Sequence, residues 1–157
     1  MTDPADRPAL ERHFTYQLNT LSKLNNLASQ ADYLAGSGLS LPEARTLAAV
    51  GSFPDLTVNA LALEVNLDKG QASRLARAMV DKGLLEALSS PEDKRLVRLR
   101  LSPAGQPLWA RVMALIEARN RALLDCLSPD EQAQLVGLFE RVLVAAKARH
   151  RGGPGRR

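Results

Sequence analysis

The chain has 157 residues, 45% of them hydrophobic, so it can fill the core of one ordinary domain and is not wholly disordered. Aromatic residues make up only 4% of the sequence, which disfavours a sandwich or barrel held by large rings, and the single cysteine, Cys126, excludes an internal disulfide bond. The formal net charge of +4 is compatible with a nucleic-acid partner without demanding one.

The sequence carries no sign of membrane insertion or export. It has no run of about 18 apolar residues, and acids and prolines stand near its start, where a signal peptide has an apolar segment. Leu, Ala and Arg are the most frequent residues, and they lose little free energy on entering a helix. We therefore expect a mainly α protein in the cytoplasm.

The first predicted element is one long amphipathic helix over residues 10–35, which no proline or glycine interrupts and whose apolar residues recur at helical spacing. Gly36 and Gly38 end it. Ser40 is placed to cap a second helix, and Glu43, three residues on, completes a capping box. This second helix ends near Gly51.

A helix–turn–helix follows. Thr57 caps a short helix that leads to Asn66, one of the few residue types that accept a left-handed turn conformation. Asp68 opens the next helix with Gln71 as its capping-box partner, and Gly83 ends that helix. Two short helices that meet across so tight a turn are typical of this motif.

Residues 84–88 and 97–101 are predicted to form a β-hairpin, because the second run alternates apolar and charged residues and turn-forming residues lie between them. A hairpin in this position is a wing. Ser102 and Pro103 then start another helix. Ser128 and Glu131 mark the start of the last one, which fades into a basic tail.

The second helix of such a motif enters the major groove of DNA. The residues of this helix outside its apolar stripe form the predicted outward face, which contains three cations and no anion. They are Lys69, Gly70, Gln71, Ser73, Arg74 and Arg77. Arg pairs with guanine, Gln with adenine and Ser with either base, whereas Lys69 and Arg77 could equally hold phosphates. Gln71 has two open interpretations, a base contact or completion of the cap on Asp68.

The wing adds cations to this face. Lys94 and Arg95 lie at its tip, from which Arg can reach a narrow, A·T-rich minor groove. Asp93 lies two residues before Arg95, a spacing that suits an ion pair holding the tip in shape. For Arg98 and Arg100 the favoured interpretation is the solvent face of an amphipathic strand.

Asp93-Lys94-Arg95, five further residues and then Leu101-Ser102-Pro103-Ala104-Gly105 resemble the signature of the MarR family of bacterial regulators, Asp-x-Arg followed after five residues by Leu-Thr/Ser-x-x-Gly. Residues 67–75 and 82–85 resemble that family's recognition helix and its entry to the wing. The resemblance implies a homodimeric winged-helix repressor, associated with the bacterial nucleoid, that binds a short palindrome. It further implies a minor-groove role for Arg95, a structural role for Asp93, and release of DNA on binding a small, often aromatic, anion. Gly70 departs from the family's usual Ser or Thr.

The expected organisation is a winged helix–turn–helix lobe over residues 37–102 and a helical dimerisation region over residues 10–36 and 103–149. Residues 1–9 are expected to be a flexible N-terminus and residues 150–157 a disordered basic tail. The helices outside the lobe carry apolar stripes too long for the lobe to bury. A two-fold homodimer is the economical explanation.

Candidates for an effector pocket are Tyr16, Tyr33, Arg45 and Trp109, because Arg45 can pair with a carboxylate and the rings can stack on an aromatic acid. Tyr33 and Trp109 can equally fill the seam between the lobe and the dimer helices. Cys126 is expected to be a buried small hydrophobe, with any redox role left open. No metal, cofactor or catalytic constellation is expected. The competing function is a winged-helix protein–protein interaction module without sequence-specific DNA binding.

Overall fold

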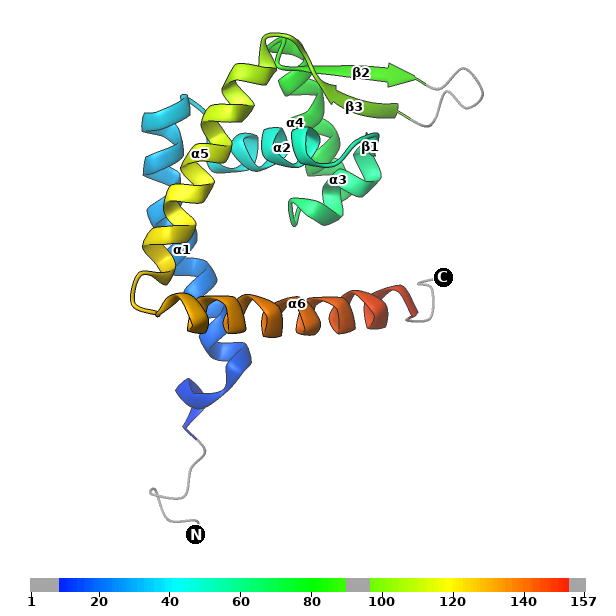
Figure 1. Ribbon diagram of the computed structural model, residues 1–157. Coiled ribbons are helices and arrows are strands. Elements are labelled where there is room, and N and C mark those ends of the chain that lie inside the picture. Colours follow the sequence, from blue (N-terminus) through cyan, green and yellow to red (C-terminus); the bar gives the residue numbers. More distant parts are fainter. Residues whose placement is uncertain (1–8, 90–96, 153–157) are drawn as a thin grey trace. The chain divides into compact units, whose positions relative to one another are not determined.

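The computed structural model describes residues 9–89 and 97–152, with side chains as far as His150, and it is mainly helical with one small sheet (Figure 1). The helices are α1 (Phe14–Ser37), α2 (Leu41–Ser52), α3 (Val58–Glu64), α4 (Lys69–Asp81), α5 (Gly105–Leu124) and α6 (Pro129–Gly152). The strands are β1 (Leu56–Thr57), β2 (Leu85–Ser89) and β3 (Val97–Leu101). This confirms the expected mainly α fold with a β-hairpin wing. The chain divides between Arg119 and Asn120, within α5, into two compact units.

The first helix is shorter than predicted at its start. Residues Leu10–Arg12 form a separate 3₁₀ helix, and His13 is extended, with φ −75° and ψ 130°. The amide of Gln17 donates to the backbone oxygen of Glu11 at 3.0 Å, which satisfies a carbonyl that a continuous helix would have paired with a backbone N–H. Apolar spacing carries through this break and therefore did not indicate it. Gly38, at φ 71°, ends α1 as predicted.

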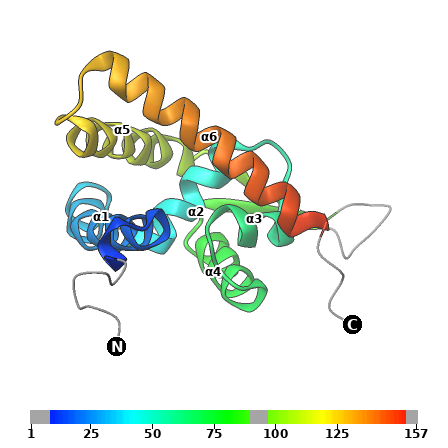
Figure 2. The same cartoon turned by 90° about the horizontal axis from the view of Figure 1, so that it is seen from below.

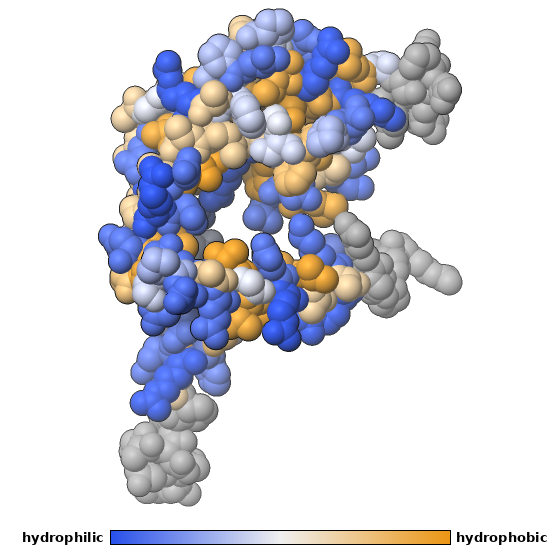
Figure 3. Space-filling view, in the orientation of Figure 1, coloured by the Kyte–Doolittle hydropathy of each residue, from blue (hydrophilic) through white to orange (hydrophobic). Residues whose placement is uncertain are grey.

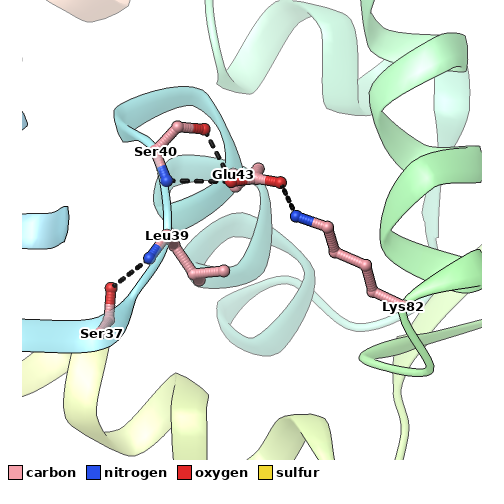
Figure 4. Close-up of polar contacts among 5 residues, drawn as sticks. All are labelled: Ser37, Leu39, Ser40, Glu43 and Lys82. Atoms are coloured by element: carbon pink, nitrogen blue, oxygen red, sulfur yellow. Dashed lines mark hydrogen bonds and ion pairs between the residues drawn. The ribbon is translucent and has the colours of Figure 1, made fainter.

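The start of α2 is the predicted capping box. The backbone N–H and the hydroxyl of Ser40 both donate to Glu43 Oε2, at 2.9 and 2.8 Å. The other carboxylate oxygen of Glu43 accepts a hydrogen bond from Lys82, at the end of α4 (Figure 4). Partial burial raises the pKa of Glu43, but hydrogen bonds from Lys82 and Ser40 outweigh it and leave the pKa below its ordinary value.

The sheet has one strand more than predicted. Its order is β1-β3-β2, all antiparallel, with Leu56 opposite Leu99 and Leu85 opposite Leu101. Leu56, Leu85 and Leu99 are buried. The hairpin of β2 and β3 confirms the predicted wing, whereas β1, two residues long, is too short for alternation to be visible in the sequence.

One core holds the first unit together. Leu47 of α2, Leu61 of α3, Met79 of α4 and Leu85 of β2 are almost wholly inaccessible to solvent, and so is Val112 of α5. Figures 1 and 2 show α1 and α5 running beside one another. Arg119 of α5 joins them by pairing with Asp32 and by donating to Asn25 Oδ1 at 3.1 Å. The winged-helix lobe therefore packs together with α1 and the first part of α5 as one unit.

Ser102 fastens the wing to α5, although this helix begins at Gly105, two residues later than the start predicted at Pro103. Its hydroxyl donates to the backbone oxygen of Gly83 at 2.6 Å and accepts the N–H of Gly105 at 2.9 Å. A Cβ on Gly105 would lie 2.1 Å from the backbone oxygen of Leu84. Only glycine permits so close an approach.

The second unit consists of the end of α5 and α6. Ser128 and Glu131 form the predicted cap: the Ser128 N–H donates to Glu131 Oε2 at 2.8 Å, and hydrogen bonds from Ser128 lower the pKa of Glu131. The amide of Gln132 donates to the backbone oxygens of Leu124 and Leu127. The helix continues to Gly152, so residues 150–152, assigned to the tail, are helical, and residues 153–157 lie outside the described part of the chain.

Both units expose apolar side chains on their outer helices. Figure 3 shows hydrophobic residues along α6. On α1 the exposed apolar residues are Phe14, Leu18, Leu21, Leu24, Leu27 and Leu34, and on α6 they are Leu135, Val136, Leu138, Val142, Leu143 and Val144. Even so, none of the helices that the structure describes combines the length and apolar character needed to cross a membrane.

Candidate nucleic-acid interface

Helices α3 and α4 meet across the tight turn that the sequence predicts. Thr57 caps α3 by accepting the N–H of Ala60 at 3.2 Å. Asn66 has φ 56°, in the left-handed region, and the N–H of Leu67 donates back to the oxygen of Ala62 at 3.0 Å. The turn therefore sets α4 across α3, and the first residues of α4 are exposed.

The first turn of α4 is a complete capping box. Asp68 Oδ1 accepts the N–H of Gln71 at 2.7 Å, and Gln71 Oε1 accepts the N–H of Asp68 at 3.2 Å. This is the capping role that the sequence left open for Gln71. The side chain of Gln71 remains exposed, and its Nε2 has no protein partner among the described residues, so it can still donate to an acceptor on DNA.

The outward face of α4 is cationic. Ala72, Ala76 and Met79 are buried against the core, whereas Lys69, Arg74 and Arg77 are exposed. Within the described ranges, residues 9–89 and 97–152, no carboxylate forms an ion pair with these three cations. A Cβ on Gly70 would lie 3.6 Å from Arg74 Nη1, so the guanidinium of Arg74 lies over Gly70, toward the start of the helix. The face therefore carries three cations that form no ion pair with a described residue.

The structure refines the prediction for Ser73. This residue is half-buried and, with Arg77, lines a hollow of about 220 Å³ between α4 and the sheet. Apolar residues complete the lining: Val58, Ala76, Val80, Ala87, Val97 and Leu99. Ser73 therefore borders the sheet as well as the outward face, because the hairpin packs beside α4.

The cations on the sheet are paired, unlike those on α4. Arg98 lies 3.5 Å from Asp55, and Arg100 lies 2.7 Å from Glu86, each on an exposed face. This agrees with the interpretation of both as residues of a solvent-facing strand. Asp93, Lys94 and Arg95, predicted at the wing tip, lie outside the described residues, and their roles stay predictions.

The four candidate pocket residues do not line one common hollow among those described. Tyr33 is buried in the core, where burial raises its pKa and Arg119 and Arg45 partly offset that effect. Trp109 packs on Gly51, where an added Cβ would lie 2.3 Å from its Nε1. Tyr16 is exposed on α1. The positions of Tyr33 and Trp109 favour the alternative that these rings fill the seam between helices.

Arg45 is the candidate that lines a hollow. Its guanidinium donates to Asn26 Oδ1, and it borders a hollow of about 360 Å³ between α2, the end of α3 and α5. Phe53, Met113 and Ile116 contribute apolar surface there, and Glu64 contributes a carboxylate. Sequence reasoning missed two lining residues: Phe53, which directly follows α2, and Met113, which only the packing of α5 beside α2 brings next to Arg45.

Cys126 was expected to be buried, and this was wrong. It is exposed in the short connection between α5 and α6, because that connection is stabilised by capping hydrogen bonds and buries little. In the two ranges that the structure describes, no three His, Cys, Asp or Glu side chains gather as metal ligands would.

The geometry is that of a winged helix–turn–helix with a cationic second helix, and residues 37–96 match the model of the MarR family. This match confirms the resemblance to the MarR family that the sequence motifs indicate. Regulators of that family are DNA-binding proteins without enzymatic activity, which supports a DNA-binding regulator here. Ser102 and Gly105, from the Leu101–Gly105 run that carried part of the resemblance, build the junction between the wing and α5.

Three known proteins illustrate how far the similarity of this chain extends. A putative transcriptional regulatory protein for the hcr operon of Thauera aromatica is 27% identical over 96 residues, which cover 61% of this chain and 58% of that protein, less than two thirds of its length. The crystal structure of a MarR/EmrR family regulator from Acinetobacter sp. ADP1 is similar with a TM-score of 0.79 and 26% identity, over 90% of this chain and 99% of that one. The PcaV regulator of Streptomyces coelicolor, solved in complex with its natural ligand, gives a TM-score of 0.71 and 25% identity, over 89% and 98% of the two chains.

Proposed function

We propose that this chain is a MarR-family repressor that binds a palindromic operator as a homodimer and releases it when a small aromatic acid binds. The observation that carries the DNA part is the outward face of α4, where Lys69, Arg74 and Arg77 are exposed and form no ion pair with any described carboxylate. Unneutralised cations on the second helix of a helix–turn–helix match the phosphates and base edges of a major groove.

Each residue of this face has a distinct proposed role. Arg74 lies toward the start of α4, the part of a recognition helix that reaches base edges, and it would pair with guanine O6 and N7. Gln71 Nε2 would donate to a base while its Oε1 holds the cap. Lys69 and Arg77 would hold phosphates, and Ser73 would contribute a hydroxyl at the edge nearest the sheet. Arg95, supported by Asp93 and accompanied by Lys94, would enter the minor groove.

The homodimer is supported by the apolar residues exposed along α1 and α6 of the single chain. Exposed apolar surface on this scale marks an interaction site in soluble proteins. A two-fold axis through these helices would present two copies of α4 to successive major grooves, which is why the operator would be a palindrome.

The effector is proposed to occupy the hollow beside Arg45. The guanidinium would pair with a carboxylate, while Phe53, Met113 and Ile116 would contact an aromatic ring. Because the hollow lies between α2, α3 and α5, a ligand there would shift α3 and α4 relative to α5 and change the spacing of the two half-sites.

The test begins with binding of the purified protein to a random-sequence duplex across a range of salt concentrations. Phosphate contacts predict that log K falls linearly with log salt, with a slope of about −0.9 per contact. Selection of bound genomic fragments would then give the operator, and symmetry of the selected site would support a dimer. Absence of binding at low salt would instead favour a protein–protein interaction module.

A further inference from the structure

An acidic side chain lies beside the cations of the candidate DNA face. Asp68, the residue before α4, is exposed, and so are Gly70 and Arg74. A Cβ on Gly70 would lie 3.2 Å from Asp68 Oδ1 and 3.6 Å from Arg74 Nη1. The carboxylate and the guanidinium therefore lie together over Gly70, which has no side chain of its own to separate them.

The carboxylate of Asp68 is held in place but only partly used. Its Oδ1 accepts the N–H of Gln71 at 2.7 Å, whereas its Oδ2 accepts no hydrogen bond from a described residue. Asp68 and Arg74 form no ion pair with each other or with another described residue. The start of α4 thus carries a fixed acceptor next to the donors of Arg74, in the part of a recognition helix that reaches base edges.

This combination of charges matches one kind of base pair. In the major groove a G·C pair presents the O6 and N7 acceptors of guanine beside the N4 donor of cytosine. A guanidinium donates to the first two atoms, and a carboxylate accepts from the third. Thymine presents its O4 acceptor where cytosine presents a donor, so a carboxylate there would face a second acceptor. A carboxylate is also repelled by phosphates, so it suits base contact better than backbone contact.

We propose that Asp68 is a specificity-determining residue, whose Oδ2 accepts a hydrogen bond from cytosine N4 of the G·C pair that Arg74 contacts through guanine. Gly70 leaves open the space into which the edge of this pair fits. The inference rests on the DNA-binding function proposed above. It adds an acceptor to a face whose proposed base contacts are otherwise made by donors and by the hydroxyl of Ser73.

The experiment compares two full-length variants that lose the same negative charge from the same helix. Asp68→Asn is the test variant, because Asn caps a helix about as well as Asp but presents an amide that cannot accept at both positions. Asp81→Asn, at the other end of α4, is the control, since Asp81 is exposed and forms no ion pair with a described residue. Fluorescence anisotropy measures binding to the selected operator, to its single-base variants and to random-sequence DNA.

Arg74→Ala identifies the base pair, as the position at which the preference of this variant relaxes. At that pair, Asp68→Asn should reduce the preference for C·G over T·A by about fivefold or more. Its affinity for random-sequence DNA should be equal to that of the wild type or higher, because an anion has been removed from a face that approaches phosphates. Asp81→Asn should keep the preference of the wild type.

A modified base tests the hydrogen bond itself. In N4-methylcytosine the methyl group replaces the N4 hydrogen that faces the major groove. This base at the identified pair should weaken binding of the wild type more than that of Asp68→Asn, because only the wild type loses a hydrogen bond. Equal decreases for the two proteins would show a steric effect of the methyl group and would overturn the inference.

Gly70→Ala tests the open space. Alanine favours a helix over glycine, so the melting temperature of this variant should be equal to that of the wild type or higher. Operator binding should nevertheless weaken, because the added Cβ fills the space between Asp68 Oδ1 and Arg74 Nη1. A variant that binds the operator as the wild type does would overturn the proposed role of Gly70.

The remaining outcomes separate this inference from the function on which it rests. An unchanged preference of Asp68→Asn at every position, with specific DNA binding intact, would leave the proposed function standing and confine Asp68 to its cap. An equal change in Asp81→Asn would assign the effect to overall charge. A uniform decrease for Arg74→Ala would remove the guanine contact that the inference requires. Absence of sequence-specific binding by the wild type would overturn both proposals.

Discussion

Lys82, which follows the last residue of α4, donates a hydrogen bond to Glu43 in the first turn of α2 (Figure 4). The same carboxylate closes the cap of α2 on Ser40. The end of the helix proposed to read DNA is thereby tied to the start of the helix that borders the hollow beside Arg45. Since Glu43 is mostly buried and Lys82 half-exposed, we expect this pair to contribute more than an ordinary surface ion pair.

Glu43→Gln should lower the free energy of unfolding by about 1 kcal/mol at pH 7, through the cap and the weakened pair. The pKa of Glu43 in the folded protein lies below its ordinary value of 4.5, so the carboxylate stabilises the fold above that pH. Its contribution is lost as the pH falls through the folded-state pKa. Urea unfolding at pH 7 and pH 3 measures this, with Glu140→Gln on α6 as the control.

The difference between Glu43→Gln and the wild type should therefore shrink toward zero in acid. A difference that is the same at both pH values would mean that the carboxylate charge plays no part.

Gly105→Ala should destabilise the first unit by about 1–3 kcal/mol, because its Cβ would lie 2.1 Å from the backbone oxygen of Leu84 and backbone must move to admit it. Gly137→Ala on α6 is the matched control: no atom lies within 4 Å of the added Cβ, so the change should stabilise that helix by about 0.5–1 kcal/mol. Thermal unfolding of both variants gives the comparison. Equal and positive shifts in Tm would contradict the close contact at Gly105.

Most helix starts could be predicted because their caps are local. Ser40 with Glu43, Asp68 with Gln71, and Ser128 with Glu131 each satisfy backbone N–H groups within three residues, so sequence spacing alone reveals them. β1 could not be predicted, since Leu56 is a strand residue only through its pairing with Leu99 on β3. The break at His13 leaves the apolar spacing unchanged and was equally invisible.

The candidate DNA face was predictable for the same reason, because helical periodicity separates the buried Ala72 and Met79 from the exposed Arg74. The position of Ser73 beside the sheet was not, since it depends on how the hairpin packs against α4. The hollow beside Arg45 depends on α5, whose Met113 and Ile116 are distant in sequence. In the candidate sites, sequence patterns left the contacts between elements undetermined.

Arg74→Ala should weaken binding to the selected operator by about 1–3 kcal/mol and relax the preference at one base pair. Arg98→Ala is the control, because Arg98 is already paired with Asp55 and should change the affinity little. Competition between the operator and single-base variants measures both effects. A decrease that is uniform across all sequences would make Arg74 a phosphate contact instead of a base contact.

Arg95→Ala should weaken binding most on operators with A·T-rich flanks, since a narrow minor groove attracts an inserted guanidinium. Asp93→Asn should weaken binding in the same direction by releasing the proposed partner of Arg95. Anisotropy with A·T-rich and G·C-rich flanks around one operator core is the measurement. Equal decreases on both flanks would count against insertion into the minor groove.

Arg45→Gln should abolish the response to aromatic acids without weakening DNA binding in their absence, because Arg45 borders the hollow and lies outside α4 and the wing. Trp109 is the single tryptophan and lies on α5 four residues before Met113, which lines the hollow, so its fluorescence provides the readout. Benzoate and its hydroxylated derivatives are the probes, with benzamide as the neutral control. If Arg45 binds a carboxylate, the acids should shift the tryptophan emission of the wild type and benzamide should not. The emission of Arg45→Gln should change with neither. An Arg45→Gln variant that responds like the wild type would exclude this role for Arg45.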